Sequence, residues 1–528
     1  MAINNVHPFH PIIYVRGFAA TQGEIDETVA DPYMGFNIGS TKARVAWTGD
    51  VQRFYFESPL VRLMSEHQYE DVYVNGDDLI AASQNDQPVP YRCIVIHRYY
   101  DDASTDFSDG KNNHPIEGFA RKLSDLILRL REKVCANPKN NVSKTDFRVY
   151  LVAHSMGGLV CRAFLQNTKL GSDEARKAVD KVFTYATPHN GIDMRIVRNV
   201  PGWLTWGDVN NFNRERMADY LDLPQSNDVS IVQNYPPERI FNLIGTNPRD
   251  YSVAHGASAW AAGEASDGLV RIENATTHGL NAAGLDVASP RAFVHRSHSG
   301  HYGIVNSEEG YQNMTRFFFG TLRVDGILDI DDITLPIDVQ KQFEAGKEVR
   351  ASYQFEIAAS VRGCQWQVTR REVRENSAIF RSYGQLFPGS DHQVRPPDRS
   401  QSPQLFTIFL DPNKSVNKKT KSVSFAFDLK ALVPDYLVDG FLFLKRHYEG
   451  GYIYRNLIIV EAVPDAQSPI GWKIKYGYQD INPGKPGTPA KIYDLPNAEP
   501  GLAFDIPIVQ KTKPGLRGAL RIQIRSWS

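Results

Sequence analysis

The chain has 528 residues, of which 42% are apolar and 23% are charged, and its net charge at pH 7 is −1. This length exceeds that of one ordinary domain, and the composition is typical of a globular protein. The even charge balance argues against a nucleic-acid partner and against an anionic membrane surface as a partner. The four cysteines are scattered without a CxxC pair, so we predict neither a disulfide framework nor a zinc site.

The first residues carry no targeting signal. The segment MAINNVHPFHPIIYVRGF (1–18) has no basic region, no long apolar stretch and no small-residue cleavage site. No apolar run of the chain reaches the roughly 18–20 residues that a membrane span requires. We therefore expect a cytoplasmic protein without a transmembrane segment.

From about Pro11 to Leu322, short apolar runs alternate with helical periodicity, which is typical of a wound α/β domain. The apolar residues of each run are continuous, as in strands that are buried on both faces of a parallel sheet. A long helix with one apolar face is expected from Ile116 to Val134, and another begins near Asn306, its expected N-cap. The apolar runs are PIIYVRG (11–17), CIVIHRYY (93–100), FRVYLVA (147–153), KVFTYAT (181–187) and RIFNLIG (239–245).

The pattern changes after about Arg323. Apolar residues then alternate with polar ones, as in Val423, Phe425 and Phe427, and turns rich in Pro and Gly such as NPGKPGTP separate the runs. A period of two with such turns predicts an antiparallel β-sandwich. We predict an α/β domain with a mostly parallel sheet over residues 1–325 and an all-β sandwich over residues 326–528.

Ser155 lies where a predicted buried strand meets a predicted helix without an intervening loop. This is the context of a nucleophile elbow, in which a serine at a strained turn points away from the sheet edge. Because strand and helix pass close together there, the positions two before and two after the serine must be small, and they are Ala153 and Gly157. The helix N-terminus directs its dipole and the Met156 N–H toward a substrate carbonyl oxygen. We predict Ser155 as a nucleophile.

The segment AHSMGG (153–158) resembles the elbow of bacterial lipases and esterases of the α/β-hydrolase superfamily. ATPHNG (186–191) resembles the GTPHxG segment of lipases, and residues 53–76 resemble larger serine esterases related to GPI-inositol deacylases. YVRGF (14–18) matches the segment that carries the first oxyanion donor, although Arg16 stands where many lipases have His. The resemblance implies an oxyanion hole formed by the backbone N–H groups of Phe18 and Met156.

The same resemblance implies the other two members of a catalytic triad. SDGLV (266–270) is similar to the lipase segment that carries the catalytic acid, which favours Asp267, with Asp250 as the alternative. SGHYGIVNS (299–307) is similar to the segment that carries the histidine. His301 is preferred because it follows a Ser-Gly turn and precedes the apolar stretch that enters the last helix. His298 is the alternative; Ser and Gly make this segment a loop, so we predict no metal site among its histidines.

Two insertions enlarge the hydrolase template, at about residues 19–91 and 192–237. The second contains VPGWLTWGDV, and insertions after strands of this fold lie above the active site. Trp203, Leu204 and Trp206 are therefore candidates for a lid or acyl-pocket wall. The alternative is a packed surface excursion with ordinary core tryptophans.

The resemblance implies a serine hydrolase that cleaves carboxylic esters through an acyl-enzyme intermediate and needs no cofactor. An acyl-lipid ester is the favoured substrate, with contact to a lipid interface. The alternatives are a phospholipase or thioesterase of the same fold, and a catalytically silent binding protein in which the sandwich carries the function. For the sandwich itself, an accessory binding domain is favoured over a structural brace.

Overall fold

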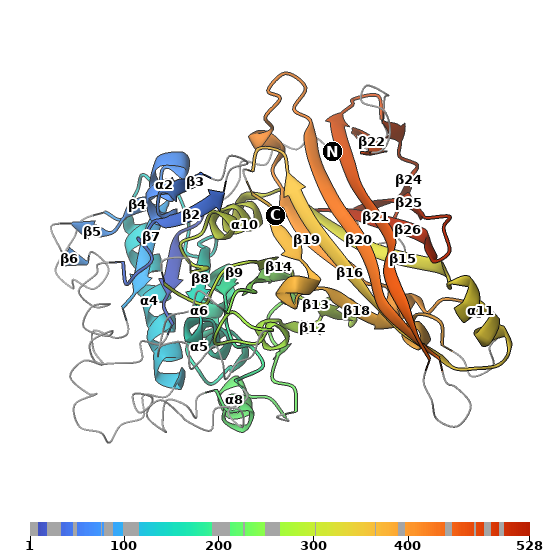
Figure 1. Cartoon of the computed structure of the whole chain (residues 1–528). Helices are drawn as coiled ribbons and strands as arrows, with labels where there is room; N and C mark the ends of the chain where they lie inside the picture. The colour runs from blue at the N-terminus through green and yellow to red at the C-terminus, as the bar shows by residue number, and fades with distance from the viewer. Residues whose placement is uncertain are drawn as a thin grey trace. The chain divides into compact units, whose positions relative to one another are not determined.

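The computed structural model contains two compact units, Pro8–Met314 and Thr315–Ser528 (Figure 1). The division falls inside helix α10 (Glu308–Phe319), whereas the sequence analysis placed the boundary at residue 325. The first strand of the second unit, β15 (Leu322–Thr334), begins where the alternating pattern begins. The structure describes residues 9–17, 33–45, 50–74, 77–78, 88–98, 116–192, 212–224, 227–248, 265–300, 303–364, 366–388, 396–438, 446–468, 471–479, 487–495 and 501–528.

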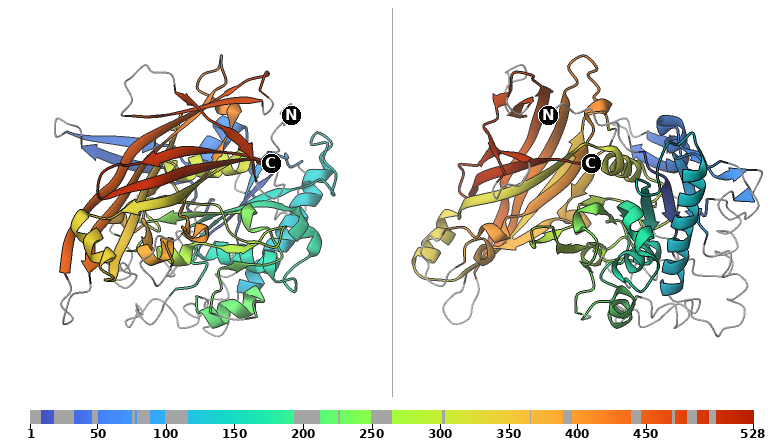
Figure 2. Two further views of the ribbon diagram at one scale, coloured as in Figure 1. Left: turned by 90° about the vertical axis from the view of Figure 1, so that its right-hand side faces the viewer. Right: turned by 180° about the vertical axis from the view of Figure 1, so that it is seen from behind.

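A seven-stranded sheet forms the centre of the N-terminal unit, and the pairings between its strands are parallel. Its central strands are buried along their length because helices flank the sheet (Figure 2). The predicted α/β architecture is therefore confirmed. In sheet order the strands are β14 (Arg291–Val294), β11 (Ile240–Gly245), β9 (Val179–Tyr185), β8 (Val149–His154), β1 (Ile12–Val15), β7 (Cys93–His97) and β4 (Glu70–Asp71).

The helices of this unit differ in how they are buried, since every residue of α5 is buried whereas α4 buries one face. In α4, Phe119, Leu123, Leu126 and Leu130 are buried at spacings of three and four, as predicted. The N-cap of α10 is Ser307 rather than Asn306, because the Ser307 hydroxyl accepts a hydrogen bond from Gly310 N at 3.0 Å. The helices are α2 (Pro59–His67), α4 (Ile116–Ala136), α5 (Met156–Gln166), α6 (Asp173–Ala178), α8 (Arg214–Leu221) and α10.

Smaller elements extend the N-terminal unit. Two hairpins lie in the first insertion, and a three-stranded sheet follows the second. These elements are β2 (Ser40–Val45) with β3 (Val51–Phe56), β5 (Tyr73–Val74) with β6 (Asp77–Asp78), the sheet of β10 (Ile231–Val232), β12 (His278–Leu280) and β13 (Asp286–Ala288), and the short helices η2 (Pro237–Arg239) and η4 (Ile272–Ala275).

The C-terminal unit consists of two antiparallel sheets. One has the order β19-β15-β26-β25-β24, and the other runs β17-β16-β20-β21-β22-β23 with β18 paired to β16. A single apolar core draws on both sheets, and the rings of Phe406 and Phe427 stack between them with centroids 4.2 Å apart. Two sheets that share a core in this way form a β-sandwich, as predicted.

The strands of the sandwich vary in length, and its helices are short. The strands are β15, β16 (Val349–Val361), β17 (Thr369–Arg371), β18 (Ile379–Ser382), β19 (Gln404–Leu410), β20 (Val423–Val438), β21 (Arg446–Pro464), β22 (Trp472–Tyr478), β23 (Thr488–Pro489), β24 (Ile492–Asp494), β25 (Gly501–Val509) and β26 (Gly515–Ser526). The helices are α11 (Ile337–Glu344), α12 (Tyr383–Leu386), η5 (Val373–Glu375), η6 (Arg399–Gln401) and η7 (Pro412–Lys414).

Candidate active site

Ser155 occupies the single residue between β8 and α5. Its φ of 53° and ψ of −126° lie in a region that non-glycine residues rarely adopt, so the turn is strained. Ser155 N donates a hydrogen bond to the Tyr185 carbonyl oxygen at 2.9 Å, which ties the turn to the end of β9. The local strand–turn–helix geometry is therefore that of a nucleophile elbow.

The elbow is too crowded for larger residues. A Cβ atom on Gly157 would lie 2.2 Å from the Val15 carbonyl oxygen, and one on Gly17 would lie 2.6 Å from Cβ of Ser155. Gly158 is equally constrained, because its Cβ would lie 2.2 Å from the Thr187 hydroxyl oxygen. The small residues around Ser155 thus follow from the close passage of the helix over the ends of the neighbouring strands.

A chain of hydrogen bonds runs from Ser155 through a histidine to a carboxylate. His298 Nε2 lies 3.0 Å from the Ser155 hydroxyl oxygen, and His298 Nδ1 lies 2.9 Å from Oδ2 of Asp267. All three residues are buried, with exposed fractions of 6% for Ser155, 3% for His298 and 1% for Asp267. The described partner of Ser155 is therefore His298, which the sequence analysis had as the alternative to His301.

His301, the histidine preferred from sequence, lies outside the described residues, and so does Asp250. The motif likeness favoured His301 because of its place before the apolar stretch. The backbone of the loop instead directs His298 toward Ser155: His298 N donates to the Asp267 carbonyl oxygen at 2.9 Å, and Ile304 N donates to the Ser297 carbonyl oxygen at 2.9 Å. Neither hydrogen bond could be predicted from the residues around His298 in the sequence.

The Asp267 carboxylate is held in place by its own turn. Oδ1 accepts hydrogen bonds from Leu269 N at 3.0 Å and from Val270 N at 2.8 Å, which leaves Oδ2 directed at His298. Gly268 has a φ of 103°, which only glycine adopts without strain. The SDGLV segment therefore works as a unit, in which the residues after the aspartate fix the orientation of its side chain.

A buried ion pair anchors the loop that carries His298. Nη2 and Nε of Arg296 contact Oε2 of Glu309 at 2.8 and 3.1 Å, and both side chains are less than a tenth exposed. Glu309 lies in the first turn of α10. The sequence analysis missed this pair; its only sequence signal is a basic residue two positions before His298 and an acidic one at the start of the last helix.

His154 packs beside the same histidine. Its Nε2 lies 3.0 Å from the His298 carbonyl oxygen, and the two rings are 5.0 Å apart. Burial above all, with smaller contributions from the neighbouring His298 and Arg16 side chains, lowers the pKa of His154, so this imidazole is neutral at pH 7. A neutral ring that donates from Nε2 supports the backbone of the loop rather than serving as a base.

Arg162 connects the elbow helix to the strands beneath it. This side chain of α5 is buried, and its guanidinium donates to the carbonyl oxygens of His189, Val229 and Ile231 at 2.8 to 3.0 Å. Burial lowers its pKa to about 10. Because the acceptors are neutral carbonyls of two segments, the turn after β9 and the stretch that enters β10, Arg162 has a structural role, and the sequence analysis did not anticipate it.

The remaining predicted site residues are only partly described. Met156 N is the first amide of α5, and such amides have no acceptor within their own helix. Arg16 donates through Nη1 to the Met34 carbonyl oxygen in the first insertion. Phe18, Trp203, Leu204 and Trp206 lie outside the described residues, so the second oxyanion donor and the lid remain predictions.

Among the described residues, no group of three or more His, Cys, Asp or Glu side chains is arranged to hold a metal ion. None of their helices is long and apolar enough to cross a membrane.

Comparisons with known proteins agree with this architecture. Residues 118–233, which include the elbow, match the family model of the PGAP1-like alpha/beta domain. No curated protein matches the chain in sequence.

Solved structures with a similar chain trace include lipase BlEst2 from Bacillus licheniformis. It is 14% identical over 60% of this chain and 93% of its own, with a TM-score of 0.29. Phospholipase PlaB from Legionella pneumophila is 13% identical over 83% of this chain and 90% of its own, with a TM-score of 0.32. A cutinase-like protein from Cryptococcus sp. is 18% identical over 39% of this chain and 74% of its own, with a TM-score of 0.16.

Three observations indicate an α/β-hydrolase fold: the parallel sheet, the elbow at Ser155 and the match of residues 118–233. The elbow lies between β8 and α5, where this fold carries its nucleophile. The N-terminal unit of this chain therefore has the α/β-hydrolase fold, and residues 118–233 are similar to the PGAP1-like alpha/beta domain.

Proposed function

We propose that the N-terminal unit hydrolyses carboxylic esters, with Ser155 as nucleophile, His298 as general base and Asp267 as the group that orients the histidine. One observation carries the proposal: the hydrogen-bond chain from the Ser155 hydroxyl through both ring nitrogens of His298 to the Asp267 carboxylate. A serine that shares a hydrogen bond with an oriented imidazole is the arrangement of a nucleophile with its base.

The first half-reaction acylates the serine. His298 Nε2 accepts the hydroxyl proton while Oγ of Ser155 attacks the ester carbonyl carbon, and Asp267 stabilises the imidazolium that forms. The negative oxygen of the tetrahedral intermediate receives hydrogen bonds from Met156 N–H and, by resemblance, from Phe18 N–H. Each such donor contributes about 3 kcal/mol in comparable sites. The carbon–oxygen bond to the alcohol then breaks, and His298 transfers its proton to the leaving oxygen.

The second half-reaction releases the acid. His298 removes a proton from water, whose oxygen attacks the acyl carbon of the Ser155 ester. Collapse of the second tetrahedral intermediate breaks the bond to Oγ, and His298 returns the proton to the serine. The residues of this chain perform all of these steps without a redox change.

For the substrate we propose an acyl-lipid ester. The family match and the fold support an esterase, lipase or phospholipase type of hydrolase. Trp203 and Trp206 of the second insertion, which follows β9, are candidates for an apolar wall of the acyl pocket. They therefore support a substrate with an apolar acyl group. A thioester and a small soluble ester are the competing substrates, and the chain length and leaving group that the enzyme prefers will separate them.

Labelling with a fluorophosphonate probe tests the mechanism, because such probes react only with an activated serine. Wild-type protein should be labelled and Ser155→Ala protein should not. A series of p-nitrophenyl esters from acetate to palmitate, with and without a detergent interface, then tests the substrate class. Activity that rises with chain length and at the interface supports the lipid ester. An unlabelled wild-type protein would instead favour a silent binding protein.

A further inference from the structure

A large cavity opens at one end of the C-terminal sandwich. It has a volume of about 1160 Å³, at the upper end of the range typical of small-molecule sites. Its lining comes from the end of β15, from α11 and α12, and from the ends of β16 and β20. All of these elements belong to the C-terminal unit, so the cavity is separate from the site at Ser155.

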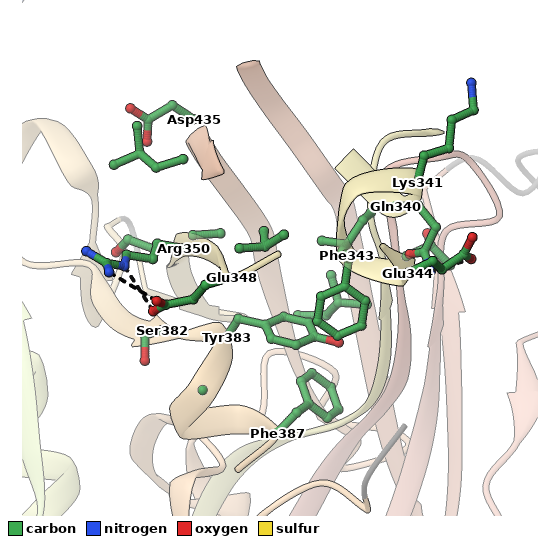
Figure 3. A pocket seen from close by; sticks show the side chains of 18 of the residues that line it. Gln340, Lys341, Phe343, Glu344, Glu348, Arg350, Ser382, Tyr383, Phe387 and Asp435 are labelled. Atoms are coloured by element: carbon green, nitrogen blue, oxygen red, sulfur yellow. Dashed lines mark hydrogen bonds and ion pairs between the residues drawn. The ribbon is translucent and has the colours of Figure 1, made fainter. Parts of the chain in front are cut away.

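Three aromatic rings form one wall of this cavity (Figure 3). The centroids of Tyr383 and Phe387 are 5.1 Å apart at 40°, and those of Phe343 and Tyr383 are 5.9 Å apart at 73°. The rings are only partly buried and none is parallel to its neighbour. They therefore form an angled, partly exposed aromatic surface that lines the cavity.

The charges around the cavity are unequal. Four carboxylates line it, those of Asp332, Glu344, Glu348 and Asp435, against the three basic side chains of Lys341, Arg350 and Lys513. Arg350 is paired with Glu348 at 3.0 Å, and Lys341 is paired at 3.2 Å with Asp338, a further acid outside the lining. The lining therefore contains one more acidic than basic side chain, and two of its basic side chains are paired with acids.

Negative charge also lies beside the aromatic wall itself. Asp332 lines the same cavity as Tyr383, and burial together with the Asp332 carboxylate raises the pKa of the Tyr383 hydroxyl. Glu344 lies next to Phe343 in α11 and accepts a hydrogen bond from Gln340 at 3.0 Å. Carboxylates and aromatic rings thus line the same cavity, and ring faces carry a negative potential of their own.

We propose that this cavity binds a quaternary ammonium group, either as the choline head group of a phospholipid or as a free choline compound. Such a group has apolar methyls, which pack on ring faces and on aliphatic side chains such as Leu335 and Leu437. It also carries a positive charge, which ring faces and carboxylates both attract. It needs no hydrogen-bond acceptor, which suits a wall of rings. The inference is independent of the proposed ester hydrolysis.

Calorimetric titration of the full-length protein tests the chemistry. The ligands are choline, phosphocholine and the neutral alcohol in which carbon replaces the choline nitrogen. None of them contains a carboxylic ester, so the result does not depend on the activity of Ser155. Choline and phosphocholine should bind, and the neutral alcohol should bind at least about tenfold more weakly because it lacks the charge. Equal binding of the neutral alcohol would overturn the proposal.

Variants locate the site. Tyr383→Ala and Phe387→Ala should each weaken choline binding by about tenfold, and Glu344→Gln should weaken it less. Tyr383→Phe keeps the ring and should bind within about threefold of wild type, which separates loss of the ring face from loss of folding. Phe380→Ala is the matched control, because Phe380 is an exposed ring of the neighbouring β18 that does not line the cavity. A Tyr383→Ala protein that is folded and binds normally would contradict the assignment.

Vesicles distinguish the two sources of the ligand. Co-sedimentation of Ser155→Ala protein with phosphatidylcholine vesicles, weakened by Phe387→Ala, would identify a lipid head group. Binding of soluble phosphocholine without binding to these vesicles would identify a free choline compound. Binding to phosphatidylglycerol vesicles that equals binding to phosphatidylcholine vesicles, with no response to soluble choline, would overturn the proposal.

Discussion

The two units of the molecule differ in how exposed the partners of buried polar side chains are, as one example from each shows. In the hydrolase unit, Asp267 and Arg162 are each 1% exposed, and their partners are also buried. In the sandwich, acids such as Asp329 are buried as well, but Asp329 pairs at 2.6 Å with Arg521, whose side chain is 37% exposed. Water therefore solvates one member of the Asp329–Arg521 pair in the sandwich and neither member of the Asp267–His298 pair in the hydrolase unit.

Unusual backbone conformations occur in both units. Ser155 and Ala186, with φ of 53° and 48°, stand directly after strands of the parallel sheet. The other described non-glycine residues with positive φ lie outside the strands of both units, at Met34, Gln68, Asn141, Asp222, Asn234, Asn376 and Lys421. A strained backbone and a buried polar side chain coincide at Ser155, at the end of a parallel strand, which is where this fold carries its chemistry. Substitutions there should affect activity and stability far more than substitutions in the sandwich.

The largest effect is expected at the serine. Ser155→Ala should lower kcat by about 10⁶-fold, as loss of a triad nucleophile does in other enzymes. The melting temperature should stay the same or rise, because Ala removes a polar group from a buried, strained position. Ester hydrolysis and thermal unfolding measured on one preparation test both statements. Activity within tenfold of wild type would refute the nucleophile.

The histidines of the loop allow a matched pair of variants. His298→Ala should lower kcat nearly as much as Ser155→Ala, because it removes the base that accepts the serine proton. His301→Ala, three residues along the same loop, should retain most of the activity. The reverse outcome would assign the base to His301 in solution.

Asp267→Asn should lower kcat by about 10⁴-fold, since the amide favours the wrong imidazole tautomer. Asn keeps the size of the side chain and the acceptor for Leu269 N and Val270 N, so the fold should survive. Kinetics against an activated ester measure the loss. Asp250→Asn is the control, and a greater loss there would move the acid to Asp250.

Glu309→Gln tests the ion pair behind the loop. Removing one partner of a buried pair leaves the other uncompensated, and the expected loss is about 3–5 kcal/mol in the free energy of unfolding. Because Arg296 stands two residues before His298, kcat should also fall while KM changes little. Chemical denaturation and steady-state kinetics provide the measurements. Unchanged stability would show that the pair is not buried in solution.

Lys181, buried in β9, should make stability depend on pH. Burial lowers its pKa from 10.5 to about 7, so between these values the folded protein has lost a proton that the unfolded chain keeps. Stability should therefore rise with pH across this window, by at most about 1.4 kcal/mol per unit. Lys181→Met should abolish the slope and raise stability at pH 7. Denaturation series at several pH values check this, and an unchanged slope would contradict it.

The smallest effect is expected on the sandwich surface. Arg517 and Asp331 form a pair at 3.8 Å whose side chains are 60% and 38% exposed. Arg517→Ala should change the free energy of unfolding by less than about 1 kcal/mol, because water screens such pairs. If Arg517→Ala lowered the free energy of unfolding as much as Glu309→Gln does, exposed pairs of the sandwich would matter as much as the buried pair of the hydrolase unit, which would contradict the prediction.

Much of this architecture follows from local patterns. Continuous apolar runs predicted the parallel strands, because a strand that is buried on both faces needs apolar residues at every position. Alternating runs predicted the sandwich, because a strand that is buried on one face needs them at every second position. The elbow was also predictable from sequence. Its crowding arises where α5 passes the end of β1, since a Cβ atom on Gly157 would meet the Val15 carbonyl oxygen. The small residues Ala153 and Gly157 nevertheless stand two positions on either side of Ser155, so the sequence itself shows the motif.

The choice among the histidines depended on the tertiary structure. His295, His298 and His301 lie within one short loop, and their spacing contains no information about which ring faces Ser155. That direction follows from the hydrogen bond between His298 N and the Asp267 carbonyl oxygen and from the anchor of Arg296 on Glu309. Both link segments distant along the chain.

The sequence by itself therefore determined the two fold classes and the position of the elbow at Ser155, since short-range periodicity and the small residues of the turn indicate these. The tertiary structure decided which histidine meets Ser155 and which aromatic rings share the cavity of the sandwich. Phe343 and Tyr383, for example, come from helices α11 and α12, which β16 and other strands separate along the chain. Contacts of this kind depend on packing between elements, and no local pattern of residues encodes them.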